Sequence, residues 1–112
     1  MWLPALGLIL GIAVGLVFSL SVPVEYARYT AIMILAALDS VLGAARAELQ
    51  GEYDNGVFLS GLLVNSLVAG ILTFVGDRLG VELYLAAIVA FGVRLFNNLA
   101  VIRRHLLTRR TA

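Results

Sequence analysis

The sequence predicts an all-α membrane protein, a bundle of four transmembrane helices, on the strength of three observations. Of its 112 residues, 62% are hydrophobic and only 13% are charged, and a soluble domain carries about twice that share of charge. The apolar residues gather in runs long enough to cross the ~30 Å hydrocarbon core of a bilayer. These runs lack the strict alternation of barrel strands, and a helix satisfies its own backbone hydrogen bonds in lipid.

The first predicted span, residues 2–24, contains no charged residue, and Pro4 lies in its first turn, where proline is tolerated. A cleaved signal peptide is disfavoured, because the segment lacks a basic start and a small-residue cleavage site. Small residues recur every four positions along one face: Gly7, Gly11, Gly15 and Ser19. Because such a strip lets another backbone approach closely, we expect helix packing along it.

The second predicted span, residues 30–47, contains several polar residues. It follows a short connector in which Tyr29 is an interface aromatic, and it meets Asp39 nine residues after its start. This polar content also fits a re-entrant or interfacial helix, which would leave three spans. An acidic loop follows, and its Asp-Asn-Gly sequence at residues 54–56 is a strong turn signal.

The third and fourth predicted spans cover residues 57–75 and 81–102. The third span has a small, polar side centred on Asn65 and a side of leucine and valine. On the small side we expect two glycines, Gly61 and Gly70, to pack against another helix. The whole chain is therefore predicted to form one integral membrane domain.

Two charged residues, Asp39 and Arg94, lie inside these spans. Each follows a tyrosine by ten residues, Tyr29 in one case and Tyr84 in the other, which places both charges about 15 Å below the same interface. A charge at that depth costs at least ~2.5–3.5 kcal/mol, so each is expected to face a partner or a wet cavity. We predict a buried polar cluster at this level, formed by Asp39, Asn65, Arg94, Asn97 and Asn98.

Two interpretations of this predicted cluster stay open. In the first, an ion pair with amide crosslinks fixes the helix register, within the chain or between subunits. In the second, the cluster is a site for a substrate, a proton or an ion at the middle of the membrane. We favour the first. A four-helix unit of this size also has little interior to enclose a pathway, so we expect function to need an oligomer.

The two halves of the chain share a plan, which favours four spans over three. Each half has a small-residue helix, a connector carrying Glu25 or Glu82, a tyrosine, and a charge ten residues later. Sequence identity between the halves is slight. With four spans the halves would be parallel repeats, unlike the inverted repeats of many transporters.

The tail, residues 103–112, predicts the orientation of the chain. It carries four arginines, Arg103, Arg104, Arg109 and Arg110. With Arg46 they outnumber Arg28 and Arg78 at the opposite side, so the positive-inside rule places both termini in the cytoplasm. Near the surface of a membrane, each arginine also attracts anionic lipid headgroups by about 1 kcal/mol.

Enzymatic and cofactor-dependent functions are disfavoured by the sequence. His105 is the one histidine, there is no cysteine, and no nucleophile triad, zinc motif or phosphate loop is present. A metal site in the acidic loop is disfavoured because Glu48, Glu52 and Asp54 match no calcium-loop spacing. We therefore expect no catalytic residue, metal or cofactor. A net charge of +1 gives no argument for nucleic-acid binding.

Two segments carry a resemblance to a known family. The stretch AALDSVLGAARA and the stretch GDRLGVELYLAAIVAFGVRLFNNLAVIRR together resemble the bacterial small basic protein family. Its members are short integral membrane proteins of unknown function, often encoded among cell-division genes. The resemblance covers nearly the whole chain, although this chain is barely basic. It implies a membrane location and a role near cell division or envelope synthesis, and it implies no biochemical activity.

From these observations we expect a non-enzymatic protein of the bacterial cytoplasmic membrane, with its C-terminus in the cytoplasm. It would self-associate, or bind a membrane partner of the division machinery, through its glycine strip and polar cluster. The alternative is a small oligomeric transporter or channel with a site around Asp39 and Arg94.

Overall fold

The computed structural model of the chain describes residues 2–18 and 21–111, and these form four α-helices. Helix α1 covers Trp2–Phe18, α2 covers Val24–Leu49, α3 covers Asn55–Leu79 and α4 covers Leu83–Thr111. No strand occurs within these described residues. The prediction of an all-helical membrane bundle is therefore confirmed.

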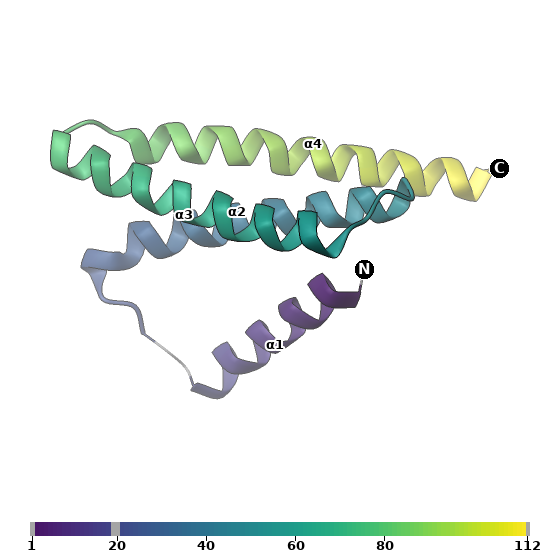
Figure 1. The fold of residues 1–112 in the computed structure, drawn as a ribbon, viewed down its shortest axis with the longest axis horizontal. Coiled ribbons are helices and arrows are strands. Elements are labelled where there is room, and N and C mark those ends of the chain that lie inside the picture. The colour runs from purple at the N-terminus through teal and green to yellow at the C-terminus, as the bar shows by residue number, and fades with distance from the viewer. Residues whose placement is uncertain (1, 19–20, 112) are drawn as a thin grey trace.

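Helices α2, α3 and α4 lie side by side and form the bundle (Figure 1). Helices α2 and α4 run in the same direction, and α3 runs against both. One end of the bundle, the connector end, holds the start of α2 and the α3–α4 turn. The other end, the loop end, holds the α2–α3 loop at residues 50–54 and the C-terminal part of α4. Helix α1 leaves this bundle at an oblique angle and packs against it only near its own N-terminus, where Pro4 is buried.

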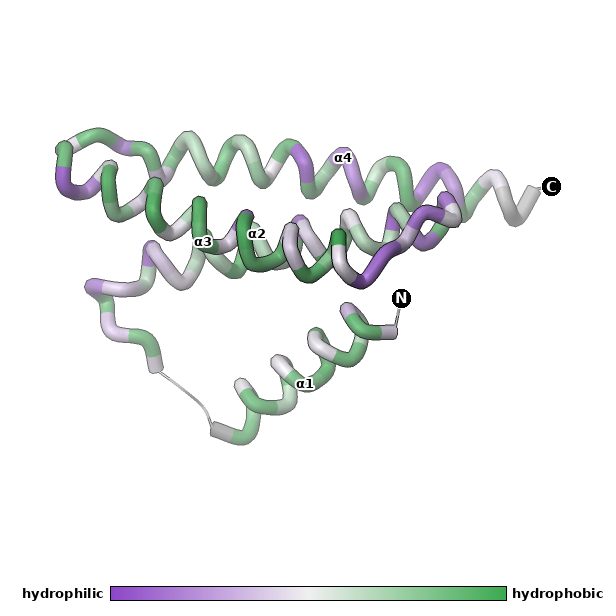
Figure 2. The backbone as a smooth tube through the Cα atoms, in the orientation of Figure 1, coloured by the Kyte–Doolittle hydropathy of each residue, from purple (hydrophilic) through white to green (hydrophobic). Residues whose placement is uncertain are grey.

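Within the described residues, three helices are long and apolar enough to cross a membrane: Val24–Leu49, Asn55–Leu79 and Leu83–Thr108. Their outward faces carry many large exposed apolar side chains, which suit lipid and not water. Figure 2 shows hydrophobic colour along these helices, with hydrophilic residues mainly at the two ends and in the middle of α4. This arrangement is that of a multi-pass membrane protein.

The structure differs from the predicted spans at the beginning of the chain. Helix α2 is continuous over 26 residues, so it is not a short re-entrant helix. The shorter segment is α1, whose 17 residues extend over about 25 Å. The first apolar run does not continue as helix to residue 24, because residues 21–23 are not helical and Pro23 precedes the first residue of α2.

The turn between α3 and α4 depends on two glycines. Gly80 ends α3 with a φ of 71°, the left-handed conformation that glycine adopts without strain. At Gly76 a Cβ atom would lie 2.7 Å from the carbonyl oxygen of Val81 and 2.9 Å from the Cβ of Leu83. There is no room for a side chain at Gly76, and this close approach lets α4 start directly beside the end of α3.

The apolar core of the bundle lies between its connector end and its middle. It consists of small and large side chains from all three helices, namely Ile32, Ala36, Ala69, Ala87 and Phe91. The three alanines allow the helix backbones to approach closely, which is how helices gain packing energy in a membrane. This core closes the bundle between the connector end and the level of Asp39.

Candidate functional site

The central polar contact of the bundle joins α2 and α4. The Nε atom of Arg94 lies 3.2 Å from Oδ2 of Asp39. The Asp39 side chain is completely buried, whereas 58% of the Arg94 side chain is exposed. The contact is an ion pair without hydrogen-bond geometry, so Oδ2 has no hydrogen-bond partner among the described residues. Because α2 and α4 run in the same direction, residues at similar distances from the starts of these helices lie at similar depths and can meet.

Two further side chains extend this contact towards the loop end. Asn98, one helical turn after Arg94, donates from Nδ2 to Oδ1 of Asp39 at 3.1 Å. Its own Oδ1 accepts a hydrogen bond from Nη1 of Arg46 at 3.3 Å. We call Asp39, Arg94, Asn98 and Arg46 the midspan cluster. It links α2 to α4 by one ion pair and two hydrogen bonds, and thus fixes the register between these helices.

The structure places the other predicted cluster residues differently. Asn65 of α3 is half-buried and lines a cavity together with Ser40 and Arg94, but it donates to none of the cluster residues in the described contacts. Asn97 is exposed and lies outside the cluster, because consecutive residues of a helix point about 100° apart and only Asn98 points at α2. Conversely, Arg46 was not predicted to belong. The sequence feature that could have predicted it is the spacing of seven residues from Asp39, which places both residues on one face of the helix.

The glycines predicted to pack helices also separate into two groups. Gly70 is close to α2, since a Cβ there would lie 3.4 Å from Sδ of Met33. Space is open around the other predicted glycines, Gly7, Gly11, Gly15 and Gly61. Ser19 lies outside the described residues. The glycine strip of α1 is therefore not used for packing within the described chain.

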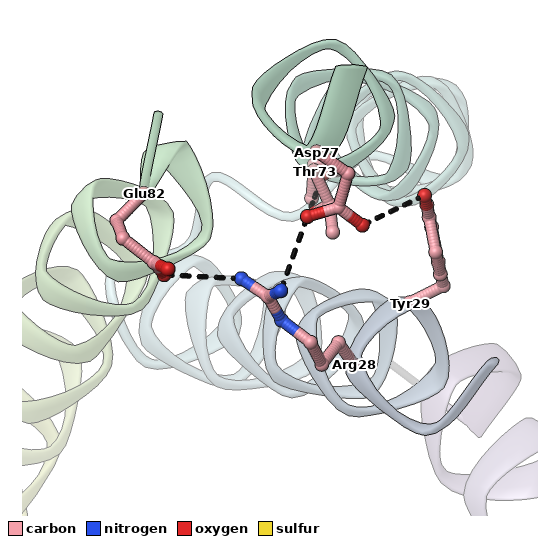
Figure 3. A network of polar contacts seen from close by, with 6 residues as sticks. Arg28, Tyr29, Thr73, Asp77 and Glu82 are labelled. Carbon is pink, nitrogen blue, oxygen red and sulfur yellow. Dashed lines mark hydrogen bonds and ion pairs between the residues drawn. The ribbon is translucent and has the colours of Figure 1, made fainter. Parts of the chain in front are cut away.

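A second polar group, the connector cluster, ties the three spans together at the connector end (Figure 3). Arg28 of α2 reaches Asp77 of α3 through Nη1 at 3.1 Å and Glu82, next to α4, through Nη2 at 3.2 Å. The hydroxyl of Tyr29 donates to the other oxygen of Asp77 at 3.1 Å. The guanidinium of Arg28 also lies over the ring of Tyr84, 4.7 Å from its centre.

Sequence reasoning missed the connector cluster. Its signal was the placement of Arg28 and the two acidic residues in connectors on the same side of the membrane. The position of the cluster also fits one edge of a bilayer core. On α4 the distance from Leu83, which follows Glu82, to Arg103 is about 30 Å by helical rise, close to the thickness of a bilayer core.

The arginines of the tail belong to a helix. Helix α4 continues without a break to Thr111, so the segment predicted as a basic tail is the end of the fourth helix. Arg103 and Arg104 are exposed there, and Nε of Arg104 donates to the carbonyl oxygen of Ala100 at 3.4 Å. The side chains of Arg109 and Arg110 lie outside the described residues.

The fold and the two clusters define a multi-pass helical membrane protein whose spans are joined by polar side chains. The chain belongs to the family described as "Protein of unknown function (DUF1290)", which matches residues 22–107, the segment that forms α2, α3 and most of α4.

Two similar proteins illustrate the family. The "Small basic protein" of Bacillus subtilis (strain 168) is 59% identical over 99% of this chain and 92% of its own length. An uncharacterized protein of Mycobacterium tuberculosis (strain H37Rv) is 43% identical over 94% of this chain and 93% of its own length. No solved structure matches the chain. The family assignment therefore agrees with the resemblance seen in the sequence and supplies no activity.

Proposed function

We propose that this chain is a non-enzymatic module of the bacterial cytoplasmic membrane that self-associates. The observation that carries this proposal is the incomplete packing of its surface within the membrane. A glycine strip on α1 has open space on it, and the exposed amide of Asn97 lies within the third long apolar span. In lipid, such groups are stabilised when another helix covers them.

A groove beside α1 gives a second helix a place to bind. It measures about 590 Å³ and is lined by apolar residues and glycines of α1, α2 and α3, including Gly7, Gly11, Leu38 and Leu59. Its occupant in our proposal is α1 of a second copy. The amide of Asn97 favours a second copy as well, because an asparagine carries both a donor and an acceptor and can pair with the same residue of a partner.

Disulfide crosslinking tests this proposal directly, since the natural chain contains no cysteine. Gly11→Cys and Gly15→Cys should each form a crosslinked dimer in native membranes. Ile9→Cys is the matched control, because it lies two residues from Gly11 on the opposite side of α1 and should crosslink poorly. If the glycine variants give no more dimer than Ile9→Cys, self-association through this face is wrong.

The orientation and the cellular role are parts of the same proposal. Arg46, in the last turn of α2, and Arg103 and Arg104, in the C-terminal part of α4, support a cytoplasmic location for the loop end and for the C-terminus. Reporter fusions at the C-terminus test it. The resemblance to a family often encoded among cell-division genes supports a role near division or envelope synthesis, and a fluorescent fusion that fails to collect at division sites would count against it.

A second candidate function is an oligomeric transporter or channel with its site around Asp39 and Arg94. It is favoured by the cavity that Arg94 and Asn65 line at this level. Purified protein in liposomes should then pass a small solute, and Arg94→Gln should alter that passage. We rank this function second, because the core formed by Ala36, Ala69 and Phe91 closes the bundle beyond the pair.

A further inference from the structure

A cavity enters the bundle from its loop end and reaches the midspan cluster. It measures about 240 Å³ and lies between α2, α3 and α4. At its mouth are residues of the α2–α3 loop, Glu52, Tyr53 and Asp54. At its inner end are Ser40, Asn65 and Arg94. The same cavity is thus lined by residues of the exposed α2–α3 loop and by a charged residue at the middle of a membrane span.

Two buried hydroxyl groups on this cavity lack partners. Ser40 Oγ and Tyr53 Oη are both buried and form no hydrogen bond within the described part of the chain. Burial, followed by the charges of Glu48 and Asp54, raises the pKa of the Tyr53 hydroxyl, which therefore keeps its proton and remains a donor. A buried polar group without a hydrogen bond costs about 1–3 kcal/mol. Two such groups on one cavity indicate that something polar fills it.

The Arg94 side chain also requires a polar environment. Its Nε faces Asp39, and more than half of the side chain is exposed although it lies in the middle of α4. An arginine at this depth is stabilised by a partner or by a water-filled cavity. Water fits this cavity, because the lining is polar at both ends and each water molecule needs only roughly 10–15 Å³ of such space.

The ends of the cavity differ in polarity and packing. Its mouth lies beside the exposed carboxylates of Glu52 and Asp54, which hydrate the entrance. Towards the connector end, Ala36 and Ala69 are completely buried, as is Thr73 one turn further along α3. Close packing at these positions leaves no path from the connector end to Arg94.

We infer that this cavity is a water-filled vestibule that brings the loop-side aqueous phase to Arg94 in the middle of the membrane. It admits water and small hydrophilic solutes from the loop end and ends at the Asp39–Arg94 pair. The vestibule is formed within a single copy of the chain, so this inference holds whether or not copies associate.

Cysteine accessibility tests the vestibule, because a thiol reacts as its thiolate and ionises only in contact with water. Ser40→Cys changes one atom at the inner end of the cavity. In membrane vesicles it should react with a membrane-impermeant, cationic methanethiosulfonate added at the loop end, and not when the reagent is added at the connector end. Glu52→Cys, in the exposed loop, identifies which vesicle face is the loop end.

Two control variants make the result decisive. Leu63→Cys lies on the exposed side of α3, two residues nearer the loop end than Asn65, and should react an order of magnitude more slowly because lipid surrounds it. Thr73→Cys lies beyond the closed core and should not react from the loop end.

The inference is overturned if Ser40→Cys is as slow as Leu63→Cys, or if it reacts from the connector end. Should Ser40→Cys fail to fold, Asn65→Cys takes its place with the same expectations. Activity is not the readout, so a failed self-association test and a failed vestibule test are independent results.

Discussion

The Arg94 guanidinium of α4 meets the Asp39 carboxylate of α2, with 3.2 Å between Nε and Oδ2, about halfway along both membrane spans. The carboxylate is fully buried and the guanidinium faces a cavity. The pair therefore combines a buried partner with an exposed one. A buried charge that keeps one solvated neighbour can fix helix register without the full desolvation cost of a dry ion pair.

Removing the acidic member of this pair should destabilise the bundle. Breaking a fully buried ion pair costs about 3–5 kcal/mol, and Asp39→Asn should cost less than that because Arg94 is more than half exposed. Thermal unfolding of the detergent-purified protein measures the loss. An unchanged melting temperature would show that the pair does not hold α2 to α4.

Asn98 and Asn97 provide a matched comparison of adjacent amides. Asn98→Ala removes the hydrogen bonds to Asp39 and from Arg46, and should lower stability by roughly 1–3 kcal/mol. Asn97→Ala should leave the stability of the single chain nearly unchanged, because Asn97 is exposed. It should instead weaken self-association. Equal effects of the two variants on unfolding would contradict the assigned midspan cluster.

Two glycines of α3 should respond in opposite ways to a methyl group. Gly76→Ala forces a Cβ against the carbonyl oxygen of Val81 and should cost about 1–3 kcal/mol. Gly61→Ala meets open space and should raise helix stability by roughly 0.5–1 kcal/mol. Unfolding curves of both variants, measured in the same detergent, decide the point. A neutral Gly76→Ala would mean that the α3–α4 turn is looser than described.

Each contact of the connector cluster should contribute little to the free energy of unfolding. Arg28 and Asp77 are both more than a third exposed, so their pair is worth about 0.2–1 kcal/mol. In a double-mutant cycle, Arg28→Gln and Asp77→Asn should show coupling in this range, and added salt should reduce it. If no coupling is measured at low salt, the connector cluster does not stabilise the fold.

The class of fold and the contact between the two charged residues could be predicted because they depend on distance along each helix. Hydropathy gives the spans, and ten residues from Tyr29 to Asp39 give a depth. In the structure, Asp39 and Arg94 are in contact at this level. The rotation of each helix about its own axis is different, because it depends on packing between helices. Periodicity along one span therefore did not separate Asn97 from Asn98.

Hydropathy alone also could not predict where the helices begin and end. Helix α4 leaves the apolar region near Ile102 but continues to Thr111, because its exposed arginines are good helix formers in water. The first apolar run continues to residue 24, but residues 21–23 are not helical. The connector cluster was missed for a related reason, since its contacts join three segments that are far apart in sequence.

Exchanging the two charges of the central pair tests this account most directly. Asp39→Arg and Arg94→Asp should each destabilise the detergent-purified protein, because each leaves two like charges at the same level. The double variant should recover most of the lost stability, since it restores one ion pair between α2 and α4. A double variant as unstable as the single variants would contradict the claim that the Asp39–Arg94 pair sets the register of the bundle.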